Sequence, residues 1–275
     1  MPASFCGTVG LKPTAGRVSR YGVLPLDYTL DHIGPLTRTV RDAGLVLNAI
    51  AGWDPKDPTS SRRAVEEYCP GVVTSLAGVR VGLPKGFFFD RAQAVVREAV
   101  LAAAKRAEAL GASVEWVEIP DNDQVAAAHR MILLPEASAV IGTFHARRDE
   151  LGADVRALYE QGRMVSAVDY LNAQRLRGVF RAAYAALFRR VDYLFTPTTL
   201  FTAPKIGSNV VEVNGVEEDV RLLTTATVRA MNLVGYPAVS VPCGVDSGGL
   251  PIGLQVAGRP FTEAGVLGVA GCVAG

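Results

Sequence analysis

Short apolar runs alternate with long helical stretches along this chain, and this alternation is the feature that most limits its possible folds. Residues 79–83 form a short apolar run that Pro84 ends. An alanine-rich stretch over residues 95–110 follows, and Gly111 closes it as glycine commonly closes a helix. Residues 113–119 then form a second short run. This order predicts a strand, a helix and a second strand that pairs parallel to the first.

The segments on either side of this unit extend the same pattern. Thr39 can cap a helix together with Asp42, three residues further on. Residues 121–188 are mostly helical in pattern, with Pro135 ending or kinking one helix and residues 166–169 opening another. These stretches predict a layer of helices beside the strands.

The last part of the chain supplies further strands. Residues 192–195 read as a short strand, and residues 220–233 predict one helix. The sequence DSGG at 246–249 lies between the apolar runs 239–243 and 252–256, which indicates a hairpin. The expected fold is therefore α/β, with a mixed, largely parallel central sheet and helices on both faces.

Composition sets the broad class of the protein. Of its 275 residues 49% are hydrophobic and 20% are charged, which excludes intrinsic disorder. No linker or block of like charge divides the chain, so a single domain over residues 1–275 is expected. The formal net charge of +1 argues against nucleic acid as the main partner, because such binding depends on neutralising many phosphates.

The cysteines and the apolar stretches indicate the cellular compartment of the protein. The four cysteines lie far apart without metal-ligand spacing, which argues against a zinc site and a disulfide framework. Neither a metal nor an organic cofactor is predicted. The first residues lack the pattern of a signal peptide. The longest uncharged stretches, near residues 193–204 and 230–245, are broken by proline, asparagine and glycine, so no membrane span is predicted. The expected location is the cytoplasm.

Generic catalytic patterns give no site. His129 and His145 fall on helical, alanine-rich segments, where a solvated or structural role is expected. His32 lies in a loop beside Asp31, but this carboxylate is expected to bond nearby backbone rather than to orient a base. Cys6 and Cys243 have apolar neighbours and are expected to be buried and inert.

Three blocks, in the same order, resemble the amidase signature family. They are PASFCGTVGLKPT at residues 2–14, the stretch from Gly16 to LDHIGPLTRTVRD at residues 30–42, and PAVSVPCG to GLPIGLQ at residues 237–255. The resemblance implies amide hydrolysis through a Ser-Ser-Lys triad, in which a lysine with a depressed pKa activates the nucleophilic serine through a bridging serine. In the family these three residues precede the position that Met1 matches. We therefore expect no catalytic residue in this chain, and Ser4, Ser19 and Lys12 receive no such role.

The resemblance also suggests substrate-binding residues. Arg177 resembles the arginine that holds the substrate carboxylate in the A-type subunits of amidotransferases, although a solvated helix charge is the alternative. Thr225 stands near the position at which those subunits carry an acid for the amino group of glutamine, which makes glutamine a less expected substrate. Thr198 follows a strand end on the expected ligand side of the sheet.

The favoured interpretation is the C-terminal part of a single domain of a general amidase, which converts a small carboxamide to an acid and ammonia. One alternative is the glutaminase subunit of a tRNA-dependent amidotransferase, which implies a B-type partner and aminoacyl-tRNA nearby. Another is an inactive fragment or paralogue that acts as a binding or structural subunit. Neither the particular amide nor the oligomeric state follows from the sequence.

Overall fold

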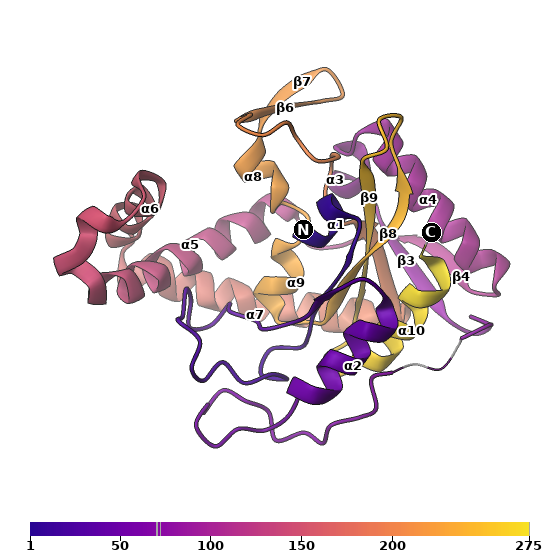
Figure 1. Ribbon diagram of the computed structural model, residues 1–275, viewed down its shortest axis with the longest axis horizontal. Coiled ribbons are helices and arrows are strands. Elements are labelled where there is room, and N and C mark those ends of the chain that lie inside the picture. Colours follow the sequence, from indigo (N-terminus) through magenta and orange to yellow (C-terminus); the bar gives the residue numbers. More distant parts are fainter. Residues whose placement is uncertain (70, 72, 275) are drawn as a thin grey trace.

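A central mixed sheet organises the molecule. The computed structural model describes residues 1–69, 71 and 73–274, and within them seven strands pair in the order β2-β1-β8-β9-β5-β3-β4 (Figure 1). The strands of this sheet are β1 (Val9–Lys12), β2 (Leu36–Thr37), β3 (Arg80–Pro84), β4 (Ser113–Val117), β5 (Tyr193–Pro197), β8 (Ala238–Val245) and β9 (Pro251–Gly258). A separate hairpin is formed by β6 (Val210–Val213) and β7 (Val216–Asp219).

Helices cover both faces of the sheet, as the sequence predicts. The main helices are α2 (Val40–Ile50), α4 (Ala94–Ala109), α5 (Asn122–Ile141), α6 (Ala153–Arg163), α7 (Ala167–Arg190), α9 (Arg229–Val234) and α10 (Glu263–Val273). The shorter helical segments are α1 (Pro2–Cys6), α3 (Phe87–Asp90), the 3-10 segment Gly142–Glu150 and α8 (Val220–Thr224). Neighbouring residues of β5 point to opposite faces, because Phe195 packs into a core with α2, α4 and α10, whereas Leu194 packs with α5, α7 and α9.

The predicted strand-helix-strand unit is confirmed. β3 and β4 pair parallel over five residues on each strand, and α4 connects them. β5 joins β3 in parallel on its other side. The remaining neighbouring strands of the described part of the sheet pair antiparallel, so "largely parallel" overstates the pairing. The reason is the β8–β9 hairpin, which inserts between β5 and β1 and imposes antiparallel neighbours on both.

Local sequence signals explain several boundaries. Thr39 accepts a hydrogen bond from the Asp42 backbone at 3.1 Å and begins α2 as predicted. Ser166 caps α7 in the same way through Asp169, at 3.1 Å. Pro135 does not end its helix, because α5 continues through it to Ile141.

The single helix predicted over residues 220–233 is wrong. The chain forms α8 and α9 instead, with a turn over residues 225–228 between them. In this turn the Thr227 hydroxyl donates to the carbonyl oxygen of Thr198, which directly follows β5, and this bond favours a turn over a continuous helix. Gly235 then ends α9 with φ of 78°, a conformation that favours glycine, and turns the chain into β8.

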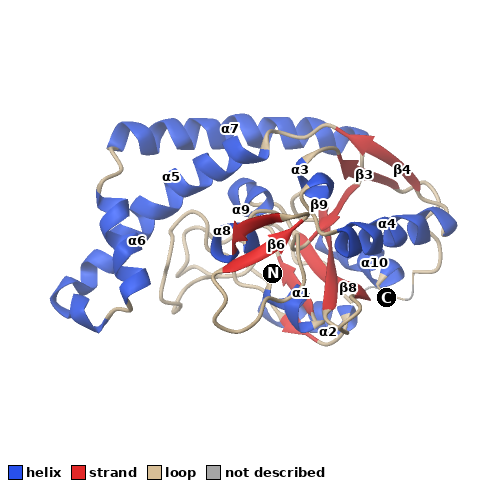
Figure 2. Ribbon diagram, turned by 90° about the horizontal axis from the view of Figure 1, so that it is seen from above, coloured by secondary structure: helices blue, strands red, loops and turns tan. Residues whose placement is uncertain are grey.

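α5 and α7 form a long helical pair that extends beyond the sheet and carries α6 at its outer end (Figure 2). Among the described residues only the helical stretch Asn122–Phe144 is long and apolar enough to cross a membrane. Length and composition are weak evidence for this, because core helices share both properties. α6, α7 and α9 all pack against α5.

Candidate functional site

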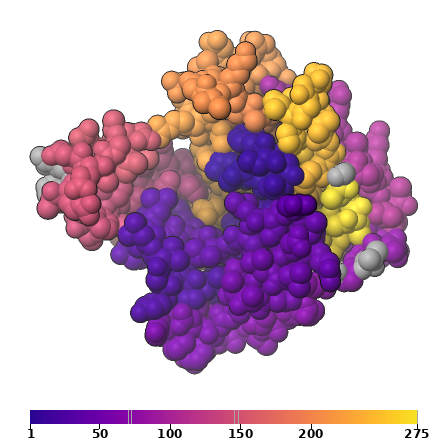
Figure 3. All heavy atoms as spheres, viewed as in Figure 1, coloured from indigo at the N-terminus to yellow at the C-terminus, as the bar shows by residue number. Residues whose placement is uncertain are grey.

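A pocket of about 430 Å³ opens where β1, α5 and the α8–α9 turn meet, and we call it the central pocket. In Figure 3 a hollow lies between the indigo first residues, the rose-coloured helices and the orange segment that holds α8. Its volume falls within the range of typical small-molecule sites. The residues that line it are Met1, Pro2, Gly10, Lys12, Leu26, Asp27, Leu30, Asp31, His129, Leu133, Thr198, Thr225, Val228, Arg229, Met231, Asn232, Ala238, Val239, Ser240 and Gln255.

The wall formed by the sheet carries hydroxyl and amide groups. Thr198, directly after β5, shares a 2.8 Å hydrogen bond with the hydroxyl of Ser240 on β8. Gln255 on β9 donates to the Thr196 hydroxyl at 2.8 Å. These side chains meet because β5, β9 and β8 are neighbours in the sheet. Thr198 therefore lies in the pocket wall, at a strand end as the sequence predicts.

The turn between α8 and α9 brings an arginine into the pocket. Arg229 donates through Nη2 to the Thr225 hydroxyl at 2.7 Å and to the carbonyl oxygen of Leu222 at 2.9 Å. Burial lowers the pKa of Arg229, and the nearby charge of Arg130 lowers it further. Thr225 thus lines the pocket as expected, but its neighbour there is a cation to which no sequence pattern pointed.

Lys12 also faces the central pocket rather than serving as the surface charge that its sequence context suggests. It is the last residue of β1, and its Nζ donates to the carbonyl oxygen of Pro13 at 3.1 Å. Burial lowers the pKa of Lys12 to about 7, although the carboxylate of Glu263 opposes this change. A large part of the lysine population is consequently neutral near pH 7.

Asn232 connects two histidines that come from distant parts of the chain. Its Oδ1 accepts from Nε2 of His129 at 2.9 Å, and its Nδ2 donates to the carbonyl oxygen of Leu30 at 2.7 Å. His32 contacts the same carbonyl oxygen through Nδ1 at 2.6 Å. Burial lowers the pKa of both histidines, to about 3 for His32, so both rings are neutral at physiological pH. His129 lines the central pocket and has a hydrogen-bond partner there, which fits the expected structural role rather than a solvated one. The side chain of His145 lies outside the described part of the structure.

Two carboxyl groups hold the loop that closes the pocket. Asp27 is 1% exposed, and burial together with the adjacent carboxylate of Glu136 raises its pKa. No described residue donates a hydrogen bond to Oδ2 of Asp27. A proton carried by Asp27 and directed at Glu136 gives this oxygen a hydrogen-bond partner. Burial raises the pKa of Glu136, but hydrogen bonds from Asp27, Tyr170 and Thr29 outweigh this and lower it.

Asp31 behaves as its turn position predicts. Its Oδ2 accepts the backbone N–H groups of Leu26 and Asp27 at 2.9 and 3.0 Å. The Asp31 carboxylate thus fixes the loop backbone rather than orienting a catalytic base.

Arg177 does not line the central pocket. It is 5% exposed, and its Nε donates to the carbonyl oxygen of Leu233 at 2.6 Å. Nη1 and Nη2 donate to the hydroxyl and carbonyl oxygens of Thr29, each at 2.8 Å. The guanidinium thus ties α7, α9 and the pocket loop together, and its substrate role remains a prediction.

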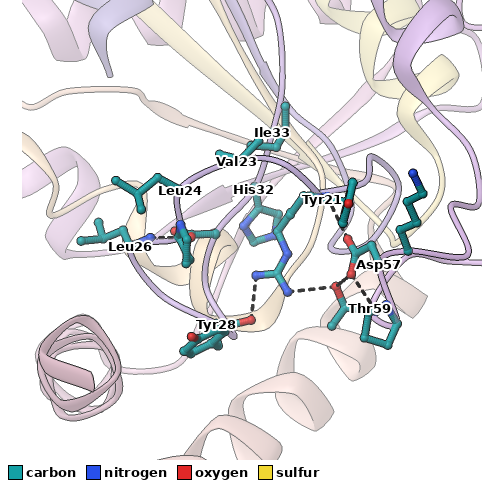
Figure 4. A pocket seen from close by; sticks show the side chains of 14 residues that line it. Tyr21, Val23, Leu24, Leu26, Tyr28, His32, Ile33, Asp57 and Thr59 are labelled. Carbon is teal, nitrogen blue, oxygen red and sulfur yellow. Dashed lines mark hydrogen bonds between the residues drawn. The ribbon is translucent and has the colours of Figure 1, made fainter. Parts of the chain in front are cut away.

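A second pocket, of about 370 Å³, adjoins the central pocket and shares Leu26 and Asp31 with it. In Figure 4 the ring of His32 lies inside this pocket. The side chains of Leu24 and Leu26 lie on one side of the ring, and Tyr28 and Thr59 lie on the other. Its surface is mainly apolar and comes from the loop over residues 21–28.

The side chains that were given no catalytic role have structural partners or lie apart. Ser4 shares a 3.1 Å hydrogen bond with Thr199, and Ser19 donates to Asp54 at 2.7 Å. Burial raises the pKa of the Cys243 thiol to about 12, which fits the expected inert cysteine. Cys6 is exposed, so the expectation that it is buried is wrong.

The pocket unites Thr198 and Thr225, two of the three predicted binding residues, and leaves out Arg177. Arg229, Asp27 and Asn232 also line it, although they were not predicted from the sequence. A signal for Arg229 was its position four residues after Thr225, which places the two on one side of a helical turn.

Comparison with known proteins identifies the family. The family model described as Amidase matches residues 1–267. An amidase of Pseudomonas putida is 41% identical over 266 residues, covering 96% of this chain and 57% of the relative. The A-type subunit of the glutamyl-tRNA(Gln) amidotransferase from Halothermothrix orenii is 36% identical over 291 residues, covering 97% of this chain and 60% of the relative.

The fold is shared with solved structures as well. One, described as a vestigial protein complex that reveals the evolutionary origins of an s-triazine catabolic enzyme, superposes with a TM-score of 0.91 at 35% identity, covering 99% of this chain and 59% of that one. The chain thus spans about three fifths of the length of the relatives that it matches. With a family match over residues 1–267 and the signature blocks in order, this chain belongs to the amidase family.

Proposed function

We propose that residues 1–275 form the C-terminal, substrate-binding part of a single amidase domain that hydrolyses a small carboxamide to a carboxylic acid and ammonia. The observation that carries the proposal is the central pocket, in which a wall of hydroxyl and amide groups faces apolar side chains. Such a pocket can orient a polar carboxamide while it buries the apolar body of the substrate.

The proposed chemistry is that of an acyl-enzyme. A Ser-Ser-Lys triad, supplied by sequence outside these 275 residues, would attack the amide carbon and expel ammonia, and water would then release the acid. The residues of this chain would bind and orient the substrate. We further propose that the protein works in the cytoplasm, in keeping with its free cysteines.

A general amidase is favoured over a glutaminase subunit by one contact. The Thr225 hydroxyl takes a hydrogen bond from Arg229 at 2.7 Å, so this part of the pocket presents positive charge. Free glutamine carries an ammonium group beside its carboxylate, and neither the Thr225 hydroxyl nor this positive charge supplies a counter-charge for that ammonium group. The proposal therefore includes no B-type partner and no tRNA.

Ammonia release tests this proposal. We expect the longest in-frame product of the gene to release ammonia from benzamide or propionamide faster than from glutamine. Translation of the DNA upstream of Met1 is expected to show a glycine-rich run with a serine, and further upstream a lysine and a second serine.

Two results would contradict the proposal in different ways. Glutamine as the best substrate would favour the amidotransferase subunit. An in-frame stop codon a few codons upstream, together with no ammonia from any amide, would favour the inactive fragment or paralogue.

A further inference from the structure

Arg229 is a partly buried cation that has no counter-ion among the described residues. Its hydrogen bonds to the described residues use Nη2 alone, and neither Nε nor Nη1 donates to any of them. None of the ion pairs in the described part of the chain includes Arg229. A partly desolvated guanidinium with free donors costs free energy that a bound anion would offset.

The acidic groups of the same pocket are already occupied. Asp27 lies beside the Glu136 carboxylate, which together with burial raises its pKa and favours its neutral form, and Asp31 accepts two backbone N–H groups of the loop. Among the described residues of the pocket lining, the positive charge of Arg229 is therefore not matched by a free carboxylate.

The surroundings of Arg229 indicate the rest of the ligand. Leu133, Val228 and Met231 line the same pocket and present apolar surface. Thr225 and Leu222 hold Nη2, which fixes the guanidinium plane, while Nε and Nη1 stay available. A planar carboxylate matches such a fork of donors better than a spherical ion does.

We propose that Arg229 is the anion anchor of the central pocket and that the preferred substrates are amides with an apolar body and a carboxylate at the end remote from the amide. This inference rests on the proposed amide-binding function. It moves the positive charge that selects the substrate from Arg177 to Arg229.

Isothermal titration calorimetry with three probes tests the anchor without requiring catalysis. The probes are 4-carbamoylbenzoate, which carries an amide and a carboxylate, terephthalamide, which carries two amides, and benzoate, which carries a carboxylate alone. We expect Arg229→Gln to weaken binding of 4-carbamoylbenzoate by about tenfold to a hundredfold, as loss of a charge-assisted pair does, and to change terephthalamide binding less than about twofold.

Two further variants make the test specific. Arg221→Gln is the matched control, because Arg221 lies on α8, pairs with Asp154 at 3.4 Å and does not line the pocket. It is expected to leave all three affinities unchanged. Thr225→Asp keeps Arg229 but places a carboxylate against it, and is expected to weaken carboxylate binding as Arg229→Gln does. This variant still tests the anchor if Arg229→Gln does not fold.

The outcomes separate the anchor from the proposed function. Equal binding of the two amide probes by the unaltered protein contradicts the anchor role of Arg229 but not the amide-binding function. Unchanged affinity for the carboxylate probe in both Arg229→Gln and Thr225→Asp has the same consequence. Binding of benzoate that depends on Arg229, with no binding of either amide, supports the anchor and overturns the amide-binding function. Absence of binding by all three probes overturns both.

Discussion

The buried carboxyl pair of Asp27 and Glu136 is a residue-scale feature that is expected to affect stability. Burial and the Glu136 carboxylate raise the pKa of Asp27 to about 8. An unfolded aspartate titrates near about 4. Between these values the folded chain binds a proton that the unfolded chain does not, so this site makes the free energy of unfolding fall as pH rises through that window.

Asp27→Asn should remove this dependence. The amide keeps an acceptor for the backbone N–H groups of Thr29 and Leu30, which now bond Oδ1 at 3.1 and 3.0 Å. It also supplies a permanent donor toward Glu136. We expect the variant to be more stable than the unaltered chain above pH 8, by roughly 1–3 kcal/mol in urea denaturation.

Asp31→Asn is the control, since Asp31 holds the same loop through two backbone N–H groups. It should lower the free energy of unfolding by weakening these two bonds, whereas Asp27→Asn raises it above pH 8. If the free energy of unfolding of Asp27→Asn falls with pH as steeply as that of the unaltered chain, Asp27 holds no extra proton.

Arg177 gives the second residue-scale prediction. Arg177→Met leaves the buried carbonyl oxygens of Leu233 and Thr29 without their donor. We expect it to lower the free energy of unfolding by about 2–4 kcal/mol, measured by chemical denaturation. Arg181→Met, one turn further along α7, removes a single 3.2 Å bond to Val234 and should cost less. Unchanged stability with a raised KM for carboxylate-bearing amides would instead return Arg177 to substrate binding.

At the element scale, the close contact between α5 and α6 depends on a glycine. A Cβ on Gly162 would lie 1.9 Å from Ser138 Oγ and 2.1 Å from the carbonyl oxygen of Leu134. Ser138 also donates to the carbonyl oxygen of Tyr159 at 2.8 Å across this contact. The two helices could not pack at this distance with any larger residue in place of Gly162.

Two glycine substitutions should therefore change the free energy of unfolding in opposite directions. Gly162→Ala is expected to lower the free energy of unfolding by about 1–3 kcal/mol because the helices must separate. Gly178→Ala on α7 meets no atom within 4 Å and should raise it by roughly 0.5–1 kcal/mol through better helix propensity. Equal effects of the two substitutions on the urea midpoint would contradict the packing explanation.

At the scale of the whole molecule, the chain has exposed apolar surface on two segments. Leu24 is 73% exposed beside other exposed apolar residues of the 21–28 loop, and Leu36 is 63% exposed on β2, at the edge of the described sheet. Exposed apolar patches and open strand edges both favour association. The 275-residue chain alone should therefore self-associate as its concentration rises.

Sedimentation velocity measures this tendency. The double variant Leu24→Ser with Leu36→Lys should shift the chain toward monomer. Ile206→Ser is the control, because Ile206 is fully exposed but lies away from both sites in sequence. A monomeric unaltered chain at all accessible concentrations would contradict the role of this surface.

Much of the fold was determined by the sequence itself, because its signals are local. Thr39 and Ser166 cap the helices that they were predicted to begin, and the strand-helix-strand unit through α4 pairs as expected. The family could also be recognised, since its motifs are contiguous blocks. These features need only neighbouring residues or a fixed order along the chain.

Only the tertiary structure determined which side chains form the site. Lys12 and Arg229 are far apart in sequence and line one pocket because a strand end and a helical turn meet there. Arg177 was assigned to the substrate by its motif, but burial brought its guanidinium to Thr29, 148 positions away, and used its donors there. The ionisation of Asp27 likewise depends on Glu136, 109 positions further along. Charge, burial and hydrogen bonding arise from contacts between distant segments, and no local pattern contains them.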